Sequence, residues 1–128
     1  AGQGTIGLEI LDKPSDVDTV IVPIGGGGLI SGIAVAIKAM RPSCRIIGVQ
    51  SEHAPSMKQS LEKKEIIKLQ NVSTIADGIA VMNPGKTTVK LIQENVDEMV
   101  SVSDSEITIA QHCANETAKM YRKVDKNV

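Results

Sequence analysis

Aromatic side chains are almost absent from this 128-residue chain, which has no Trp, no Phe and a single Tyr at position 121. Proteins that hold single-stranded nucleic acid stack the bases on such side chains, so this mode of binding is excluded. The formal net charge is −1 and the lysines are scattered, whereas nucleic-acid-binding surfaces concentrate positive charge. We therefore expect no nucleic-acid partner.

Long apolar runs and clustered metal ligands are missing as well. No apolar stretch reaches the roughly 18 residues that a membrane-spanning helix needs, and no basic-then-apolar leader opens the chain. Cys44 and Cys113 are far apart, and neither has a second Cys or His at the spacing of metal ligands. His112 adjoins Cys113, but adjacent helix positions point about 100° apart and cannot form a nucleophilic pair. We expect a cytoplasmic protein with reduced thiols and no membrane contact.

The chain has enough apolar residues for one core, since 41% of it is hydrophobic. Residues 1–5 lead directly into an apolar segment without an initiator Met, which indicates a piece cut from a longer protein. We therefore expect a single, partial domain over residues 1–128.

The segment from residue 19 to residue 50 predicts a strand, a helix and a second strand. Residues 19–24 are almost continuously apolar, as in a parallel strand that is covered on both faces. Residues 29–40 form an apolar helix that Arg41-Pro42 ends, and residues 45–50 give the next strand. A βαβ unit of this length is typical of α/β proteins.

The remainder continues the alternation of helices and strands. We predict helices over 56–64 and 86–96, an extended piece over 66–69 and a third strand over 98–102. Ser103 and Glu106 form a capping-box signature ahead of an amphipathic helix, whose inward face is Ala110, Cys113, Ala114, Thr117, Ala118 and Tyr121. The predicted fold is α/β, a three-layer parallel sheet with flanking helices.

Four consecutive glycines, residues 25–28, lie between the first predicted strand and the apolar helix. Because glycine has no Cβ, the backbone can turn sharply here and present consecutive N–H groups to one ligand. The positive end of the helix dipole adds to the attraction. The loop therefore predicts a binding site for a phosphate group.

A dinucleotide-binding loop is one alternative interpretation of these glycines. That loop has the pattern Gly-x-Gly-x-x-Gly, followed by an acid at the end of the next strand. This chain offers only Gly26-x-Gly28-x-x-x-Gly32, with Glu52 as the candidate acid. The match is loose.

A nucleoside-triphosphate loop is a second alternative, at residues 80–87. The segment matches Gly-x-x-x-x-Gly-Lys-Thr except that Ala80 replaces the first Gly, and Pro84 removes an N–H that the phosphate would use. We predict instead a turn, then a helix N-terminus near Gly85 with Lys86 in solvent.

Four motifs in order along the chain carry a resemblance. They are Gly-Gln-Gly-Thr-Ile at 2–6, Val-Pro-Ile-Gly-Gly-Gly-Gly-Leu at 22–29, Gly-Val-Gln-Ser-Glu at 48–52 and Thr-Ile-Ala-Asp-Gly-Ile-Ala-Val at 74–81. Together they closely resemble the threonine dehydratase and serine racemase family, pyridoxal-phosphate enzymes of the tryptophan-synthase-β type, over residues 1–110. The catabolic threonine dehydratases look nearest. The resemblance implies that the chain is part of the cofactor domain of such an enzyme.

The resemblance also implies where the cofactor lies. The glycine loop of the family wraps the phosphate of pyridoxal phosphate, so the implied contacts are Gly25, Gly26, Gly27, Gly28 and the amide of Leu29. Gly78 would lie near the cofactor ring, although a tight turn that needs glycine explains it equally well. Asp77 is expected to be a turn or cap residue.

Catalytic and metal-binding residues of the family are not matched. The Schiff-base lysine of the family stands in a Ser-x-Lys-x-Arg-Gly context, and no lysine of this chain does. Some members bind a divalent cation at positions that correspond to Gln50, Ala54 and Ser56, where both carboxylates are absent. Glu52 and His53 are an adjacent polar pair on a predicted loop. We expect no catalytic lysine and no metal site here.

For the parent protein, the resemblance implies a lyase that removes water and then ammonia from L-threonine or L-serine to leave a 2-oxo acid. It also implies a homo-oligomer. Serine racemase shares the motifs and remains an alternative within the family. The alternative of another class is a non-catalytic α/β module that binds phosphate or a nucleotide.

Overall fold

The computed structural model describes residues 2–12 and 16–125, with side chains up to residue 118. The elements in chain order are α1 (Gly4–Asp12), β1 (Thr19–Pro23), α2 (Gly28–Met40), β2 (Arg45–Ser51), α3 (Ser56–Lys63), the short 3-10 helix η1 (Asp77–Ile79), α4 (Lys86–Asn95), β3 (Glu98–Val102) and α5 (Asp104–Asp125). The helices and strands predicted over 19–64 and 86–102 are confirmed. Residues 66–69, predicted as an extended piece, belong to no helix or strand, and the Leu69 amide donates to the Met82 carbonyl at 3.0 Å.

The three strands form one parallel sheet in the order β1-β2-β3. Val20 pairs with Ile46, and Gly48 pairs with Met99, so neighbouring strands run in register along their length. The predicted βαβ unit is β1, α2 and β2. Because the strands are parallel, their carboxyl ends meet at one edge of the sheet, which is where ligands bind in this class of fold.

The core lies between one face of the sheet and the helices. Val20, Val22 and Ile46 point from the sheet toward α2, and α3 and α4 contribute Met57 and Ile92. Gly48 lets this layer pack closely, since a Cβ at that position would lie 2.8 Å from the sulfur of Met99. The predicted parallel α/β sheet with flanking helices is confirmed.

The other face of the sheet is open, which corrects one expectation. Alternate residues of β1 are buried and exposed, and Ile21 is 66% exposed, so the prediction of a strand covered on both faces is wrong. A continuously apolar strand indicates two covered faces, but the described part of this chain supplies helices for one of them only.

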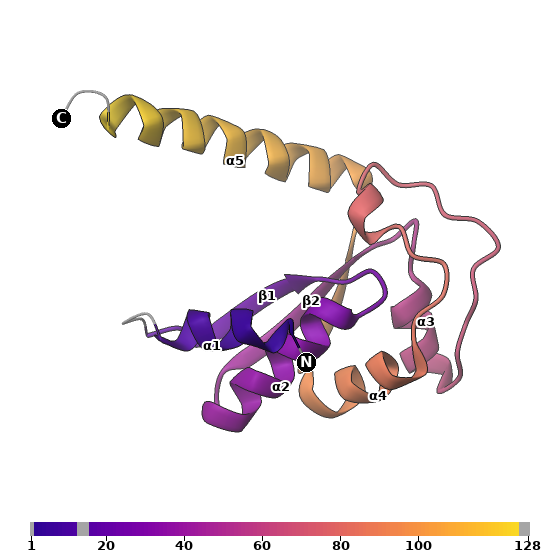
Figure 1. Cartoon of the computed structure of the whole chain (residues 1–128). Helices are drawn as coiled ribbons and strands as arrows, with labels where there is room; N and C mark the ends of the chain where they lie inside the picture. The colour runs from indigo at the N-terminus through magenta and orange to yellow at the C-terminus, as the bar shows by residue number, and fades with distance from the viewer. Residues whose placement is uncertain (1, 13–15, 126–128) are drawn as a thin grey trace.

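The last helix differs from its expected packing. The capping box is confirmed, since the Ser103 amide donates to Oε2 of Glu106 at 2.7 Å and the Glu106 amide donates back to the Ser103 hydroxyl at 3.2 Å. Beyond its first turn, α5 extends away from the sheet (Figure 1), and its described side chains from residue 108 onward are exposed. Cys113 is therefore exposed rather than inward. The predicted position of Tyr121 lies outside the described side chains.

The N-terminal helix α1, which the sequence did not predict, packs across α2. Two glycines make the crossing close: a Cβ at Gly32 would lie 2.8 Å from the Gly4 nitrogen, and a Cβ at Gly7 would lie 3.0 Å from the Ile33 oxygen. Among the described helices, including α1 and α5, none has the length and apolar character needed to cross a membrane.

Candidate functional site

The glycine loop at the end of β1 has a backbone that only glycine adopts easily. It is anchored where the Ile24 amide donates to the Val49 carbonyl at 2.8 Å. At Gly27 the backbone is left-handed, with φ of 87°, immediately before α2 begins. A Cβ on Gly27 would lie 2.6 Å from Cε of Met57 and 2.9 Å from Cδ1 of Ile92. Both the conformation and the packing thus require glycine at this position.

The amide groups of the loop lack acceptors among the residues that the structure describes. The first backbone hydrogen bond of α2 runs from the Ser31 amide to the Gly27 carbonyl at 3.0 Å. The amides of residues 25–30, which precede Ser31, donate to no residue that the structure describes. Gly28 is exposed, and a Cβ there would have no atom within 4 Å. Free donors, open space and the positive end of a helix dipole together suit a phosphate group.

Gly25 forms the closed side of the loop, against the segment 79–81. A Cβ on Gly25 would lie 2.9 Å from Cγ2 of Val81 and 3.1 Å from Cα of Ile79. The Ser56 hydroxyl fixes this segment in turn by donating to the Val81 carbonyl at 2.8 Å. The second and fourth of the resembling motifs, far apart in the sequence, are therefore in contact.

Gly78 lies at the edge of the same segment, and its surroundings bear on one of the two explanations given for it, a tight turn that needs glycine. Its φ is not in the left-handed region, and a Cβ there would meet no atom within 4 Å, so the turn does not require glycine. The residue lines a hollow of about 270 Å³ at the carboxyl end of the sheet, together with Pro23 and Val102. The position of Gly78 beside a cofactor ring stays a prediction. Asp77 is confirmed as a turn residue, because its Oδ1 accepts from the Gly78 amide at 2.8 Å.

A hydrogen-bonded cluster that the sequence did not predict joins residues 74–75, just before Gly78, to Asp104, which follows β3. The Thr74 hydroxyl lies 2.5 Å from Oδ1 of Asp104, and the Ile75 amide donates to Oδ2 at 3.2 Å. The hydroxyl of Ser51 reaches the Thr74 oxygen at 3.1 Å, and Nδ1 of His53 lies 3.5 Å from Oδ2 of Asp104. The Thr74 hydroxyl, followed by the Ile75 amide and His53, keeps the pKa of Asp104 below its usual value.

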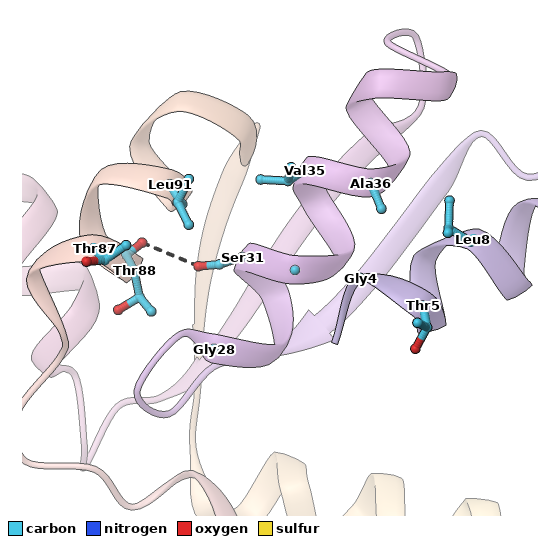
Figure 2. A pocket seen from close by; sticks show the side chains of 11 residues that line it. Gly4, Thr5, Leu8, Gly28, Ser31, Val35, Ala36, Thr87, Thr88 and Leu91 are labelled. Carbon is cyan, nitrogen blue, oxygen red and sulfur yellow. Dashed lines mark hydrogen bonds between the residues drawn. The ribbon is translucent and has the colours of Figure 1, made fainter. Parts of the chain in front are cut away.

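Another hollow lies on the helix side of the glycine loop, between α1, α2 and α4 (Figure 2). It has a volume of about 550 Å³ and touches the loop only at Gly28. Leu8, Val35 and Leu91 give it an apolar lining. The polar side chains of its lining are hydroxyls, those of Thr5, Ser31, Thr87 and Thr88, and none of the described titratable side chains lines it.

The positions expected for a metal in relatives are closed in this chain. Gln50, Ala54 and Ser56 are all buried, and Oε1 of Gln50 accepts from the Lys58 amide at 3.0 Å. Glu52 and His53 are exposed. Within the described ranges, no three His, Cys, Asp or Glu side chains come together as a metal-binding group.

The segment that imitates a nucleoside-triphosphate loop has the predicted structure of a turn and a helix N-terminus. Gly85 is extended, with φ of −77° and ψ of 145°, and it precedes α4 directly. Lys86 is exposed, as expected. The element directly before this turn is the 3-10 helix η1, whereas a nucleoside-triphosphate loop follows a strand directly.

Comparison with known proteins places the chain in a family. A family model described as pyridoxal-phosphate dependent enzyme matches residues 1–121. The chain is 52% identical over 120 residues to the L-threonine ammonia-lyase of Thermotoga maritima, covering 94% of this chain and 30% of that protein. It is 55% identical over 107 residues to the catabolic L-threonine dehydratase TdcB of Escherichia coli, covering 84% of this chain and 32% of that protein. The chain thus spans less than a third of the length of these two relatives.

A comparison with solved structures leads to the same kind of protein. The structure of maize serine racemase superposes with a TM-score of 0.87 at 42% sequence identity, covering 92% of this chain and 37% of that one. The match to the family model reaches residue 121, beyond the resemblance predicted over residues 1–110. The chain therefore belongs to the family of pyridoxal-phosphate dependent enzymes.

Proposed function

We propose that this chain is the phosphate-holding part of an enzyme that removes water and then ammonia from L-threonine or L-serine to leave a 2-oxo acid. The single observation that carries the proposal is that the glycine-loop amides have no acceptor in the described part of the chain, which leaves them free to hold the cofactor phosphate. The relatives named L-threonine ammonia-lyase and catabolic L-threonine dehydratase, at 52% and 55% identity, support the reaction.

The residues of the loop have separate roles in this proposal. The amides of Gly25, Gly26, Gly27, Gly28 and Leu29 hold the phosphate, and Gly78 leaves room for the ring. Pyridoxal phosphate, when bound, supplies the electron sink that stabilises negative charge on the substrate α-carbon. The role proposed for this chain is to bind the phosphate of that cofactor and to orient its ring.

We assign no catalytic residue and no metal ligand to these 128 residues. No lysine stands in the Ser-x-Lys-x-Arg-Gly context of the family, so the lysine that carries the cofactor is proposed to belong to another part of the parent protein. The chain is accordingly a partial cofactor domain that is inactive alone. The parent is proposed to be a cytoplasmic homo-oligomer of amino-acid catabolism, without nucleic-acid or membrane partners. The two free cysteines are compatible with that compartment.

A pair of variants tests the phosphate site by calorimetric titration with pyridoxal phosphate. Gly28→Asp places a carboxylate at the open side of the loop, where its Cβ meets no atom. A negative charge at a helix N-terminus stabilises the fold but repels a phosphate, so binding should be lost without loss of stability. Gly28→Asn has nearly the same size without the charge and serves as the matched control. Equal binding by wild type and Gly28→Asp would contradict the site.

Two further measurements separate the alternatives. Borohydride reduction followed by mass spectrometry should give no covalent adduct, and an adduct at one lysine would show that the chain has its own catalytic lysine. Titration with a nucleoside monophosphate tests the non-catalytic nucleotide-binding module, which predicts tighter binding than that of pyridoxal phosphate.

Serine racemase is the second candidate activity, favoured by the superposition on the maize enzyme. The two activities differ in their product from L-serine in the parent protein: a 2-oxo acid and ammonia for the dehydratase, D-serine for the racemase. We expect the 2-oxo acid to dominate.

A further inference from the structure

Thr88, in the first turn of α4, reaches the glycine loop from a distant part of the chain. Its Oγ1 lies 2.8 Å from the carbonyl oxygen of Gly26, across 62 positions of sequence. Within residues 2–12 and 16–118, no other side chain hydrogen-bonds to residues 25–28. Thr88 therefore holds one peptide group of the loop, the one between Gly26 and Gly27.

The bond determines where the next amide points. The peptide between Gly26 and Gly27 is trans, so its C=O and N–H groups point in opposite directions. Because Thr88 engages the C=O group, the N–H of Gly27 is directed away from α4. Gly27 is buried, and its amide has no acceptor among the residues described. An unpaired donor in such a place costs free energy until a ligand or water accepts from it.

A peptide between two glycines needs such an anchor. Neither residue has a Cβ, so the peptide plane can rotate through a half-turn at little steric cost. Without the hydrogen bond, the amide of Gly27 would spend part of its time facing α4. A donor that must first be turned toward its ligand binds more weakly than one already in place.

Thr88 is itself fixed in position. Its carbonyl oxygen lies 3.5 Å from the hydroxyl of Ser31 in α2, the contact drawn as a dashed line in Figure 2. A Cβ on Gly27 would lie 3.1 Å from Cβ of Thr88, so the two backbones approach closely. The Thr88 hydroxyl is also 2.9 Å from the Gly85 carbonyl, so two carbonyls share its single hydrogen.

We propose that Thr88 is a positioning residue, which orients the Gly26–Gly27 peptide so that the Gly27 amide is ready to donate to a phosphate. The inference rests on the proposed function of the loop as a phosphate site. It adds a residue of α4, a helix that none of the four sequence motifs includes, to the determinants of cofactor affinity.

Three variants of the full 128-residue chain test this role. Thr88→Val removes the hydroxyl and keeps the branched shape, whereas Thr88→Ser keeps the hydroxyl. Thr87→Val is the matched control, since Thr87 occupies the same helical turn, is exposed and has no side-chain hydrogen bond to any described residue. For each protein, calorimetry gives the Kd of inorganic phosphate and of pyridoxal phosphate. The carbonyl ¹³C chemical shift of Gly26, measured without ligand, reports the hydrogen bond itself.

We expect Thr88→Val to raise both Kd values about tenfold and to move the Gly26 carbonyl shift. Thr88→Ser and Thr87→Val should stay close to wild type in both measurements. Thermal unfolding identifies a variant that does not fold, and Thr88→Ala then replaces Thr88→Val, because it removes the hydroxyl without adding volume.

Two results would overturn the proposal. An unchanged Gly26 shift in Thr88→Val would show that the hydroxyl does not hold this carbonyl. A moved shift with unchanged affinities would show that the orientation does not matter for phosphate binding. If the wild-type chain bound neither probe, the proposed function of the loop would fail, while the Gly26 shift would still decide whether Thr88 orients the peptide.

Discussion

The hydroxyl of Thr74 lies 2.5 Å from Oδ1 of Asp104, and this contact joins the loop that carries Gly78 to the first turn of α5. The same oxygen of Thr74 accepts from the Ser51 hydroxyl at 3.1 Å and from the Ala76 amide at 3.2 Å. One hydroxyl therefore connects the ends of β2 and β3 with the segment that packs on Gly25. The position of Gly78 beside the glycine loop depends on this connection.

Thr74→Val should destabilise the chain by about 1–2 kcal/mol, because it removes the hydrogen bonds that the Thr74 hydroxyl makes with Asp104, Ser51 and the Ala76 amide. Urea unfolding measures the free energy. Thr74→Ser retains the hydroxyl and should lose well under half of that amount. Equal losses in the two variants would mean that the methyl group, rather than the hydrogen bonds, matters at this position.

Acid should destabilise the fold through Asp97. The Ile46 amide, which donates to its Oδ2 at 2.7 Å, and the Lys38 ammonium, at 2.8 Å from the same oxygen, keep the pKa of Asp97 below its usual value of 3.8. A carboxyl whose native pKa is lowered contributes stability above its unfolded pKa, and this contribution is lost as the pH falls through the native pKa.

Urea unfolding as a function of pH tests this with Asp97→Asn. The wild type should be more stable than the variant at pH 6, and the difference should shrink as the pH falls below 3.8. The pKa values of Asp104 and Glu106 are lowered as well, so both proteins should lose stability in acid. A difference that stays constant from pH 6 to the acid end would show that Asp97 contributes nothing by its charge.

Two neighbouring glycines should respond in opposite ways to alanine. Gly27→Ala forces a side chain into a left-handed conformation against Met57 and Ile92, and should cost about 2–4 kcal/mol. Gly28→Ala meets no atom within 4 Å and improves helix propensity, so its effect on unfolding should be small. Chemical denaturation measures the free energy of unfolding of both variants. Similar losses would mean that the loop has a different backbone from the one described.

The two cysteines differ in exposure, and their reactivity tests whether α5 is exposed in solution. Cys44 is 1% exposed and Cys113 is exposed on α5, so the native chain should have one thiol that reacts fast with a disulfide reagent. Cys113→Ser should remove that fast phase, and Cys44→Ser should leave it. Two protected thiols would mean that another surface covers α5 in solution.

Much of this fold can be predicted from the sequence because its signals are local. The apolar run before the glycines, the capping box of Ser103 and Glu106, and the alternation of strand and helix each depend on residues a few positions apart. The run of four glycines likewise predicts a sharp turn before the helix, although it does not say that Gly27 is the residue with the left-handed backbone.

The contacts that complete the site depend on distant residues, and no local pattern reveals them. Thr88 contacts Gly26 across 62 positions and Asp104 contacts Thr74 across 30 positions, so each pair meets only once the sheet has formed. The open face of the sheet escapes prediction for a related reason. The residues of β1 are apolar on both faces, and the sequence of a strand does not say which chain segment covers it.

An NMR titration of the ¹⁵N-labelled chain with pyridoxal phosphate tests the central claim most directly. We expect the amide resonances of residues 25–29 and Gly78 to move together and to saturate with one Kd. Inorganic phosphate should move the loop resonances and leave Gly78 unchanged, because Gly78 is proposed to face the ring rather than the phosphate. The absence of shifts in the loop, or shifts confined to the apolar hollow at Leu8, Val35 and Leu91, would contradict the account.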